Sequence, residues 1–161
     1  METTMAIGHV RVVKHDKETG EVVFDRTYKN KITDFARKQS AALWAGQYVK
    51  TPSQIILGTG TNVNGPQSSD TALWAPIAAS KKKMSYAETF LNYYVQYSAT
   101  YMQSEVLGTL TSGNPTQTIA LTEAGLLDDD GNLWAHVALT DVTHDNTSTL
   151  SVQWQVMHDA N

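Results

Sequence analysis

The chain has 161 residues, of which 41% are hydrophobic and 17% are charged, and this composition fits one β-rich globular domain spanning residues 1–161. Its formal net charge of -4 offers no general attraction to phosphate backbones, so nucleic acid is not an expected partner. The lack of cysteine excludes disulfides and thiolate metal sites, and no window approaches the ~20 apolar residues of a membrane span, so we expect a soluble protein with no membrane partner.

Two segments near the N-terminus, residues 10–13 and 21–28, are rich in β-branched and aromatic side chains. They flank residues 15–20, which contain the Asp and Gly that favour a tight turn. An N-terminal β-hairpin is therefore predicted over about residues 8–29. Its edge could extend the sheet of a neighbouring protein, which makes it a candidate assembly arm.

A helix is predicted over residues 33–45. Apolar residues recur there at helical spacing, Thr33 can cap the first turn with its hydroxyl, and Gly46 can end the helix in the left-handed conformation. Because an isolated helix of this length is marginal in water, its apolar stripe, which includes Phe35, should pack against the sheet.

The middle of the chain combines a short strand with a long connection. Residues 54–57 are predicted to form the strand, and the polar, Gly-rich residues 58–66 begin the loop. Farther along this loop we expect a brief helical turn from Asp70 to Trp74. Asp70 would cap the turn, and Leu73 and Trp74 would anchor it in the core.

The segment over residues 86–102 matches two patterns. Apolar and aromatic residues alternate strictly at its end, yet some of its residues also fit one face of a helix: Phe90, Leu91, Tyr94 and Val95. A strand is favoured because aromatic residues and the later alternation suit a half-buried pleated surface. Residues 108–117 are then expected to form a loop or a wide hairpin turn.

The C-terminal part carries the clearest pattern. Residues 121–127 and 133–139 alternate on either side of residues 128–132 (DDDGN), whose residue types accept positive φ angles, so a β-hairpin is predicted. Residues 150–156 show the same period of two and form another strand. Together these elements predict a mainly β fold, an antiparallel β-sandwich of jelly-roll-like type with one amphipathic helix near residues 33–45.

Two motifs look like ligand-binding loops but lack the required context. The run Gly58-Thr59-Gly60-Thr61 is not followed by Gly-Lys-Ser/Thr or by a third glycine at dinucleotide-binding spacing, so its glycines are expected to serve backbone geometry. Asp128, Asp130 and Asn132 place oxygens at alternate positions, but the bidentate Glu and the remaining EF-hand spacing are missing. A hairpin turn is expected there instead of a calcium loop.

The titratable residues predict no catalytic, cofactor-binding or metal site. The histidines show no HExxH or other paired metal spacing, so surface or cross-strand roles are expected for His9, His15, His136, His144 and His158. Acid/base chemistry would need the fold to pair an Asp with one of three candidates, Glu88, Glu105 or Glu123. No serine lies in a Gly-x-Ser-x-Gly elbow, and the basic run 81–83 is expected to be solvated surface. We therefore predict a protein that is not an enzyme and has neither cofactor nor metal.

Aromatic residues supply the main functional alternative, a carbohydrate-binding module that contacts a host surface. The tryptophans that could line a sugar-binding groove are Trp44, Trp74, Trp134 and Trp154. Their apolar neighbours favour core positions instead.

A family resemblance is carried by fragments in a fixed order along nearly the whole chain. The fragments are KHDKETG (14–20), NKIT (30–33) before the helix, ILGTGT (56–61), SDTAL (69–73), LTEAGLLD (121–128), DGNLWAH (130–136) and LSVQWQV (150–156). In this order they resemble small structural proteins of tailed bacteriophages and are similar in pattern to the N-terminal domains of phage tail-collar fibres.

The resemblance implies a non-enzymatic virion protein, assembled in the bacterial host cytoplasm, whose partners are other virion proteins. A homo-oligomer, with a trimer favoured, is expected by analogy with fibres and decoration proteins. Fibre proteins continue into a shaft and a tip, whereas this chain stops after its final strand, so a tail, neck or fibre-attachment component is the first expectation. A capsid decoration or head-spike protein is the alternative within the virion.

Overall fold

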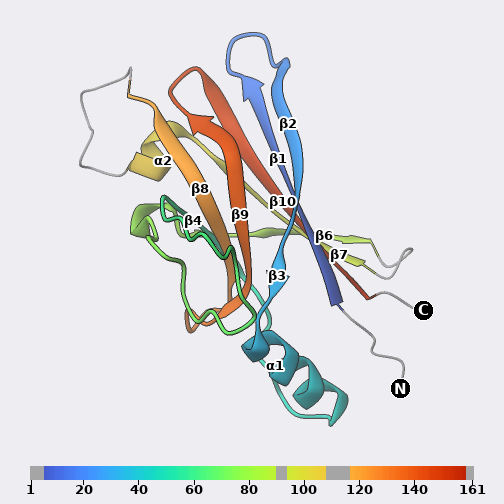
Figure 1. Ribbon diagram of the computed structural model, residues 1–161. Helices are drawn as coiled ribbons and strands as arrows, with labels where there is room; N and C mark the ends of the chain where they lie inside the picture. The colour runs from blue at the N-terminus through green and yellow to red at the C-terminus, as the bar shows by residue number, and fades with distance from the viewer. Residues whose placement is uncertain (1–5, 90–93, 108–116, 159–161) are drawn as a thin grey trace.

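Two antiparallel five-stranded sheets make up most of the protein in a computed structural model that describes residues 6–89, 94–107 and 117–158 (Figure 1). Sheet A contains, in spatial order, β2 (Val22–Lys29), β1 (Ala6–Asp16), β10 (Ser148–His158), β7 (Tyr94–Tyr101) and β6 (Ser85–Thr89). Sheet B contains β3 (Lys31–Ile32), β9 (Leu133–His144), β8 (Ile119–Leu127), β4 (Gln54–Gly58) and β5 (Lys82–Lys83). The helices of the described residues are α1 (Asp34–Trp44), α2 (Gln103–Leu107) and the 3₁₀ turn η1 (Ala78–Ser80).

The main core lies between the two sheets. Val12 and Trp154 of sheet A are fully buried, as are Ile55 and Leu57 of sheet B, and all four belong to one apolar cluster. Full burial of one such side chain contributes roughly 1.5–3 kcal/mol. The predicted mainly β, antiparallel sandwich with one amphipathic helix is therefore confirmed.

The N-terminal hairpin is built into sheet A. β1 pairs with β10 along its whole length and with β2 on its other side, which leaves β2 at the edge of the sheet. In the turn, a carboxylate oxygen of Asp16 accepts hydrogen bonds from the amides of Glu18 and Thr19, and Gly20 has a φ of 72°. The predicted hairpin is confirmed, and β2 is its strand at the edge of sheet A.

Helix α1 begins as the sequence predicts. The Thr33 hydroxyl accepts a hydrogen bond from the Ala36 amide, and Gly46 follows the helix with a φ of 76°. The Thr33 hydroxyl also donates to the Leu133 carbonyl at 2.7 Å, and Phe35 packs edge to face on Trp134. The cap therefore fixes the helix to sheet B, at the end of the sandwich opposite the β1–β2 turn (Figure 1).

Two local predictions are wrong. The chain from Asp70 to Trp74 forms bends, and the helical turn comes later as η1, because the Asp70 carboxylate caps the amide of Gln67 and contacts His136 instead of starting a helix. Of the predicted anchors, Leu73 is buried and Trp74 is half-buried.

The single strand predicted over residues 86–102 is two antiparallel strands, β6 and β7, followed by α2. The strict alternation is confirmed for β7, where Tyr97, Ala99 and Tyr101 face the core. Most of the predicted loop over residues 108–117 lies outside the described residues.

The β8–β9 hairpin is confirmed, but two bulges interrupt its alternation. The pairing changes register between Leu121 and Glu123 and again between Leu126 and Leu127. The second bulge sets His136 opposite Gly125. Because neighbours opposite each other share a face, His136 lies on the face of Gly125 and Glu123, which points away from the main core.

Candidate functional site

An apolar groove opens between the two sheets at the end that carries α1. Its volume is about 210 Å³, and its walls include Leu43 of α1, Val95 and Val156 of sheet A, and Leu126 and Trp134 of sheet B. We call this feature the α1 groove. It exists because α1 covers this end of the sandwich without filling the space between the sheets.

Large side chains beside the α1 groove face solvent. Leu43 is 45% exposed, and the next residue, Trp44, is 89% exposed. Tyr48, which lies just beyond the helix, is 90% exposed. Monomeric proteins seldom leave such side chains uncovered around an apolar depression unless a partner or ligand binds there.

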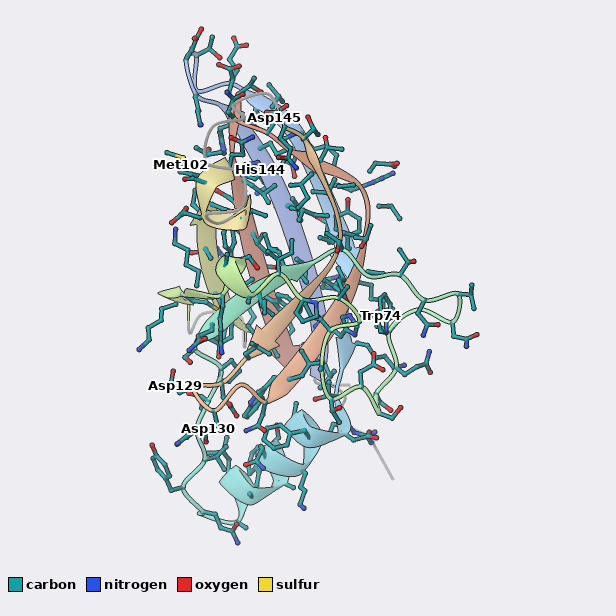
Figure 2. The ribbon with its side chains drawn as sticks, turned by 90° about the vertical axis from the view of Figure 1, so that its left-hand side faces the viewer. Trp74, Met102, Asp129, Asp130, His144 and Asp145 are labelled. Atoms are coloured by element: carbon teal, nitrogen blue, oxygen red, sulfur yellow. The ribbon has the colours of Figure 1, made fainter. Side chains whose placement is uncertain are left out.

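Charged residues border the same end of the protein. Asp129 and Asp130 of the β8–β9 turn lie toward α1, whereas His144 and Asp145 lie at the opposite end (Figure 2). Lys50 forms an ion pair with Asp130 at 2.7 Å, and Ser53 donates to Asp129 at 2.6 Å. These contacts attach the 45–53 connection to the turn and support the rim of the α1 groove.

The Asp-rich turn is held by its own hydrogen bonds. Asp128 is buried and accepts hydrogen bonds from the amides of Asp130 and Asn132, the Asn132 side chain and the Trp134 indole. Burial opposes ionisation of Asp128, but the hydrogen bonds from Asn132 and Trp134 outweigh it and lower its pKa. The hairpin turn predicted at this motif is confirmed, with Asp128 as its central acceptor.

A second polar cluster lies on the outer face of sheet B. The Glu123 carboxylate accepts hydrogen bonds from the amides of Gly60, Trp74 and Ala75 at 2.7–3.0 Å. Its Oε2 atom lies 2.9 Å from Nε2 of His136. Glu123 thereby attaches both ends of the loop over residues 59–76, which we call the strap, to β8.

His136 connects this cluster to the middle of the strap. Its Nδ1 atom lies 2.8 Å from Oδ2 of Asp70, and the Trp74 ring lies against the imidazole with centroids 4.5 Å apart. The His136 and Glu123 side chains are 0% exposed, and that of Asp70 is 18% exposed. The cluster is therefore an interior network, with Asp70 as its outermost member.

The electrostatics of the cluster favour charge on both buried partners. Burial opposes ionisation of Glu123, but hydrogen bonds from His136 and the three backbone amides outweigh it and lower the Glu123 pKa. Burial likewise disfavours the charged form of His136, but Glu123 and Asp70 outweigh it and raise the His136 pKa.

The strap also covers a small apolar cluster on the same face, formed by Ile56, Leu73, Leu127 and Leu133. Close packing of the strap on Glu123 explains the second glycine of the Gly58-Thr-Gly-Thr motif. A Cβ at Gly60 would lie 2.5 Å from the Trp74 Cβ and 2.7 Å from the Glu123 carboxylate. The prediction that these glycines serve backbone geometry is confirmed at Gly60.

The surface role predicted as one alternative for the histidines is wrong at two positions, whereas the cross-strand alternative holds for His136, which contacts Glu123 on the paired strand β8. His136 and His144 are 0% exposed, and the hydrogen-bonding group near the buried His144 ring is the backbone of Met102. Burial lowers the pKa of His144. His9 and His15 are half-buried in β1, and the side chain of His158 lies outside the described set.

The three glutamates considered for acid/base chemistry lie in different surroundings. Glu123 meets His136, as described above, whereas Glu105 forms an ion pair with Lys82 at 2.7 Å. Lys82 also donates to the Thr100 carbonyl, so the basic run is not simply a solvated loop but contributes strand β5. The side chain of Glu88 lies outside the described set.

The tryptophans divide between core and surface. Trp134 and Trp154 are buried, which confirms the core prediction for both, and Trp74 is half-buried against His136. The core prediction is wrong for Trp44, which ends α1 and points to solvent. Because the adjacent Leu43 is also hydrophobic, the local sequence did not indicate that Trp44 is exposed.

Comparison with known protein families, curated proteins and solved structures found no match to this chain. Within residues 6–89, 94–107 and 117–158, the acidic and histidine side chains form no group arranged to hold a metal ion. In the same part of the chain, no helix has the length and apolar character needed to cross a bilayer.

Proposed function

We propose that this protein is a non-enzymatic structural component of a bacteriophage virion, in the tail, the neck or the fibre attachment, and that it docks to other virion proteins through the α1 groove and its rim. The observation that carries the proposal is the exposure of Leu43, Trp44 and Tyr48 beside an apolar groove. The order of sequence fragments that resembles phage tail-collar proteins supports the identity of the partners.

The apolar area left uncovered beside the α1 groove favours docking of a partner. Water contact with Trp and Tyr rings is unfavourable by roughly 25 cal/mol per Å² of apolar surface, and both side chains are typical anchors of protein interfaces. The groove beside them offers a partner side chain an apolar receptor. A rigid sandwich with such a face suits permanent assembly, in which an exposed anchor becomes buried.

A homotrimer in the tail or neck is the assembly we favour, on the analogy with phage fibres. A capsid decoration or head-spike protein needs the same stable sandwich and the same kind of docking face. The two positions differ in the number of copies that each particle carries.

The docking proposal is tested by substitutions on the rim. Trp44→Ser combined with Tyr48→Ser should leave the fold intact, because both side chains are largely exposed, yet it should reduce incorporation into particles. Loss of an interface anchor typically weakens binding by about 2 kcal/mol, or roughly 30-fold. The matched control is Val63→Ser, which removes an apolar side chain that is 100% exposed on the strap.

Incorporation is measured by mass spectrometry of purified particles from a complemented deletion strain. The proposal predicts wild-type incorporation for the Val63→Ser control and a large loss for the double variant. Equal incorporation of the double variant and the wild type would exclude the α1 rim as the docking face.

A carbohydrate-binding module is the second candidate, because exposed aromatic rings stack on sugars. Trp44 is the strongly exposed indole, since Trp134 and Trp154 are buried. Glycans from the host wall should then change the fluorescence of the wild type but not that of Trp44→Phe. Unchanged wild-type spectra would remove this candidate.

A further inference from the structure

In the cluster around His136, two carboxylates flank the imidazole ring and favour its protonated form. Both ring nitrogens lie within 2.9 Å of carboxylate oxygens, Nδ1 from Asp70 and Nε2 from Glu123. An ionised carboxylate can only accept hydrogen bonds, so both nitrogens donate when Asp70 and Glu123 are both ionised. With both carboxylates ionised, this geometry fits an imidazolium that bridges the strap to β8.

We propose that His136 is a proton-controlled lock of the strap: as the imidazolium it holds residues 59–76 closed over sheet B, and its deprotonation opens the strap. A neutral imidazole carries only one N–H, so one nitrogen lone pair would face a carboxylate. Unscreened repulsion in a buried site disfavours that arrangement strongly. The strap carries Asp70, so it is the element that moves away from His136 when the lock opens.

The charged surroundings of His136 come from each neighbouring element. Glu123 faces it from β8, Asp70 faces it from the strap, and Lys31 is its pairing partner on β3. Lys31 is exposed, so its charge is screened by solvent. The two carboxylates therefore dominate, and the imidazolium leaves the cluster with a net charge of about -1.

The direction of the pH response follows from the two buried groups. The His136 pKa is raised, so its contribution to the closed strap is complete below its ordinary value of 6.5 and is lost as the pH rises through the raised value. The Glu123 pKa is lowered, so its contribution is complete above its ordinary value of 4.5 and is lost as the pH falls through the lowered value. The lock is closed between these limits and opens on the alkaline side through His136.

Opening has a defined structural consequence. The amides of Trp74 and Ala75 lose their acceptor, and the strap exposes the apolar cluster that contains Leu73, Leu127 and Leu133. The Leu57 amide, which donates to the Ser80 hydroxyl at 2.8 Å, lies outside the strap and should stay protected. The lock is thus a switch that presents a second apolar surface, and it does not depend on the docking function of the α1 rim.

Hydrogen exchange of the wild-type protein tests the lock, resolved to single amides by NMR and corrected for intrinsic rates. Between about pH 6 and about pH 9, protection of the Trp74 and Ala75 amides should fall at least tenfold relative to that of Leu57, since each unit of pKa displacement corresponds to a factor of ten. The ¹⁵N shifts of His136 should show two protonated ring nitrogens at the lower pH. A single protonated nitrogen at that pH, or constant relative protection, would overturn the proposal.

A variant makes the test specific. In Asp70→Asn, a neutral His136 can donate from Nε2 to Glu123 and accept at Nδ1 from the asparagine amide, so the strap should remain closed at about pH 9. The control is Asp34→Asn, which removes an exposed carboxylate at the start of α1. The backbone amide of Asp34 donates to the Ser68 carbonyl of the strap, so this control lies beside the strap, and the variant should keep the wild-type pH response. A wild-type response in Asp70→Asn would contradict the lock.

Discussion

Removing the Thr33 hydroxyl should lower the stability of the protein, because this one buried oxygen joins α1 to sheet B. It accepts from the Ala36 amide at 3.2 Å and donates to the Leu133 carbonyl at 2.7 Å, and Thr33 is 0% exposed. Thr33→Val keeps the shape but removes both hydrogen bonds. The loss of the cap contributes about 1 kcal/mol and the loss of the second hydrogen bond about another 1 kcal/mol, so the variant should unfold about 2 kcal/mol more easily.

The matched variant Thr33→Ser keeps the hydroxyl and loses only a buried methyl group. That loss should destabilise the protein by about 1 kcal/mol. For a chain of this size, about 1 kcal/mol corresponds to roughly 2–4 °C in melting temperature, so the valine variant should melt about 4–8 °C below the wild type. Thermal and urea unfolding followed by circular dichroism measure both values. A serine variant less stable than the valine variant would refute the assignment of the hydroxyl as the link between α1 and β9.

Three further predictions concern buried contacts. Gly60→Ala should destabilise the protein by about 1–3 kcal/mol in urea unfolding, because its Cβ would overlap the strap contacts, whereas the exposed Thr61→Ala should have little effect. Asp128→Asn turns an amide group toward donors and should lower stability by about 1–3 kcal/mol. The exposed Asp129→Asn is the control, and a loss of stability in Asp128→Asn smaller than that in the control would contradict this prediction. Both Asp128 and Glu123 have lowered pKa values, so stability should fall as the pH drops below their ordinary values of 3.8 and 4.5 and the two carboxylates are protonated. A urea unfolding midpoint that does not change in this acid range would oppose the prediction.

Elements with a strong local pattern were predictable from the sequence. The Thr33 cap and Gly46 mark the ends of α1, and the DDDGN turn marks the β8–β9 hairpin. The region around Asp70 was not predictable in this way, because its carboxylate meets His136, a residue 66 positions away. The local sequence cannot show whether a potential capping residue caps a helix or instead contacts a residue far along the chain.

The Glu123–His136 contact was hidden by one bulge. With regular pairing across the five-residue turn, His136 would lie opposite Ala124 and share the face of the main core. The register change between Leu126 and Leu127 moves it to the face of Glu123. The exposure of Trp44 was hidden for a different reason, since an apolar residue at the end of a helix has the same sequence signature whether it packs inside the protein or against a partner.

We propose that this protein is a minor structural component of a phage particle. Quantitative mass spectrometry of purified particles, normalised to the major capsid protein, tests it most directly. In a tail or neck position, the protein should be present at a small fraction of the capsid copy number. An abundance equal to that of the capsid protein would indicate head decoration, and complete absence from the particles would contradict the claim.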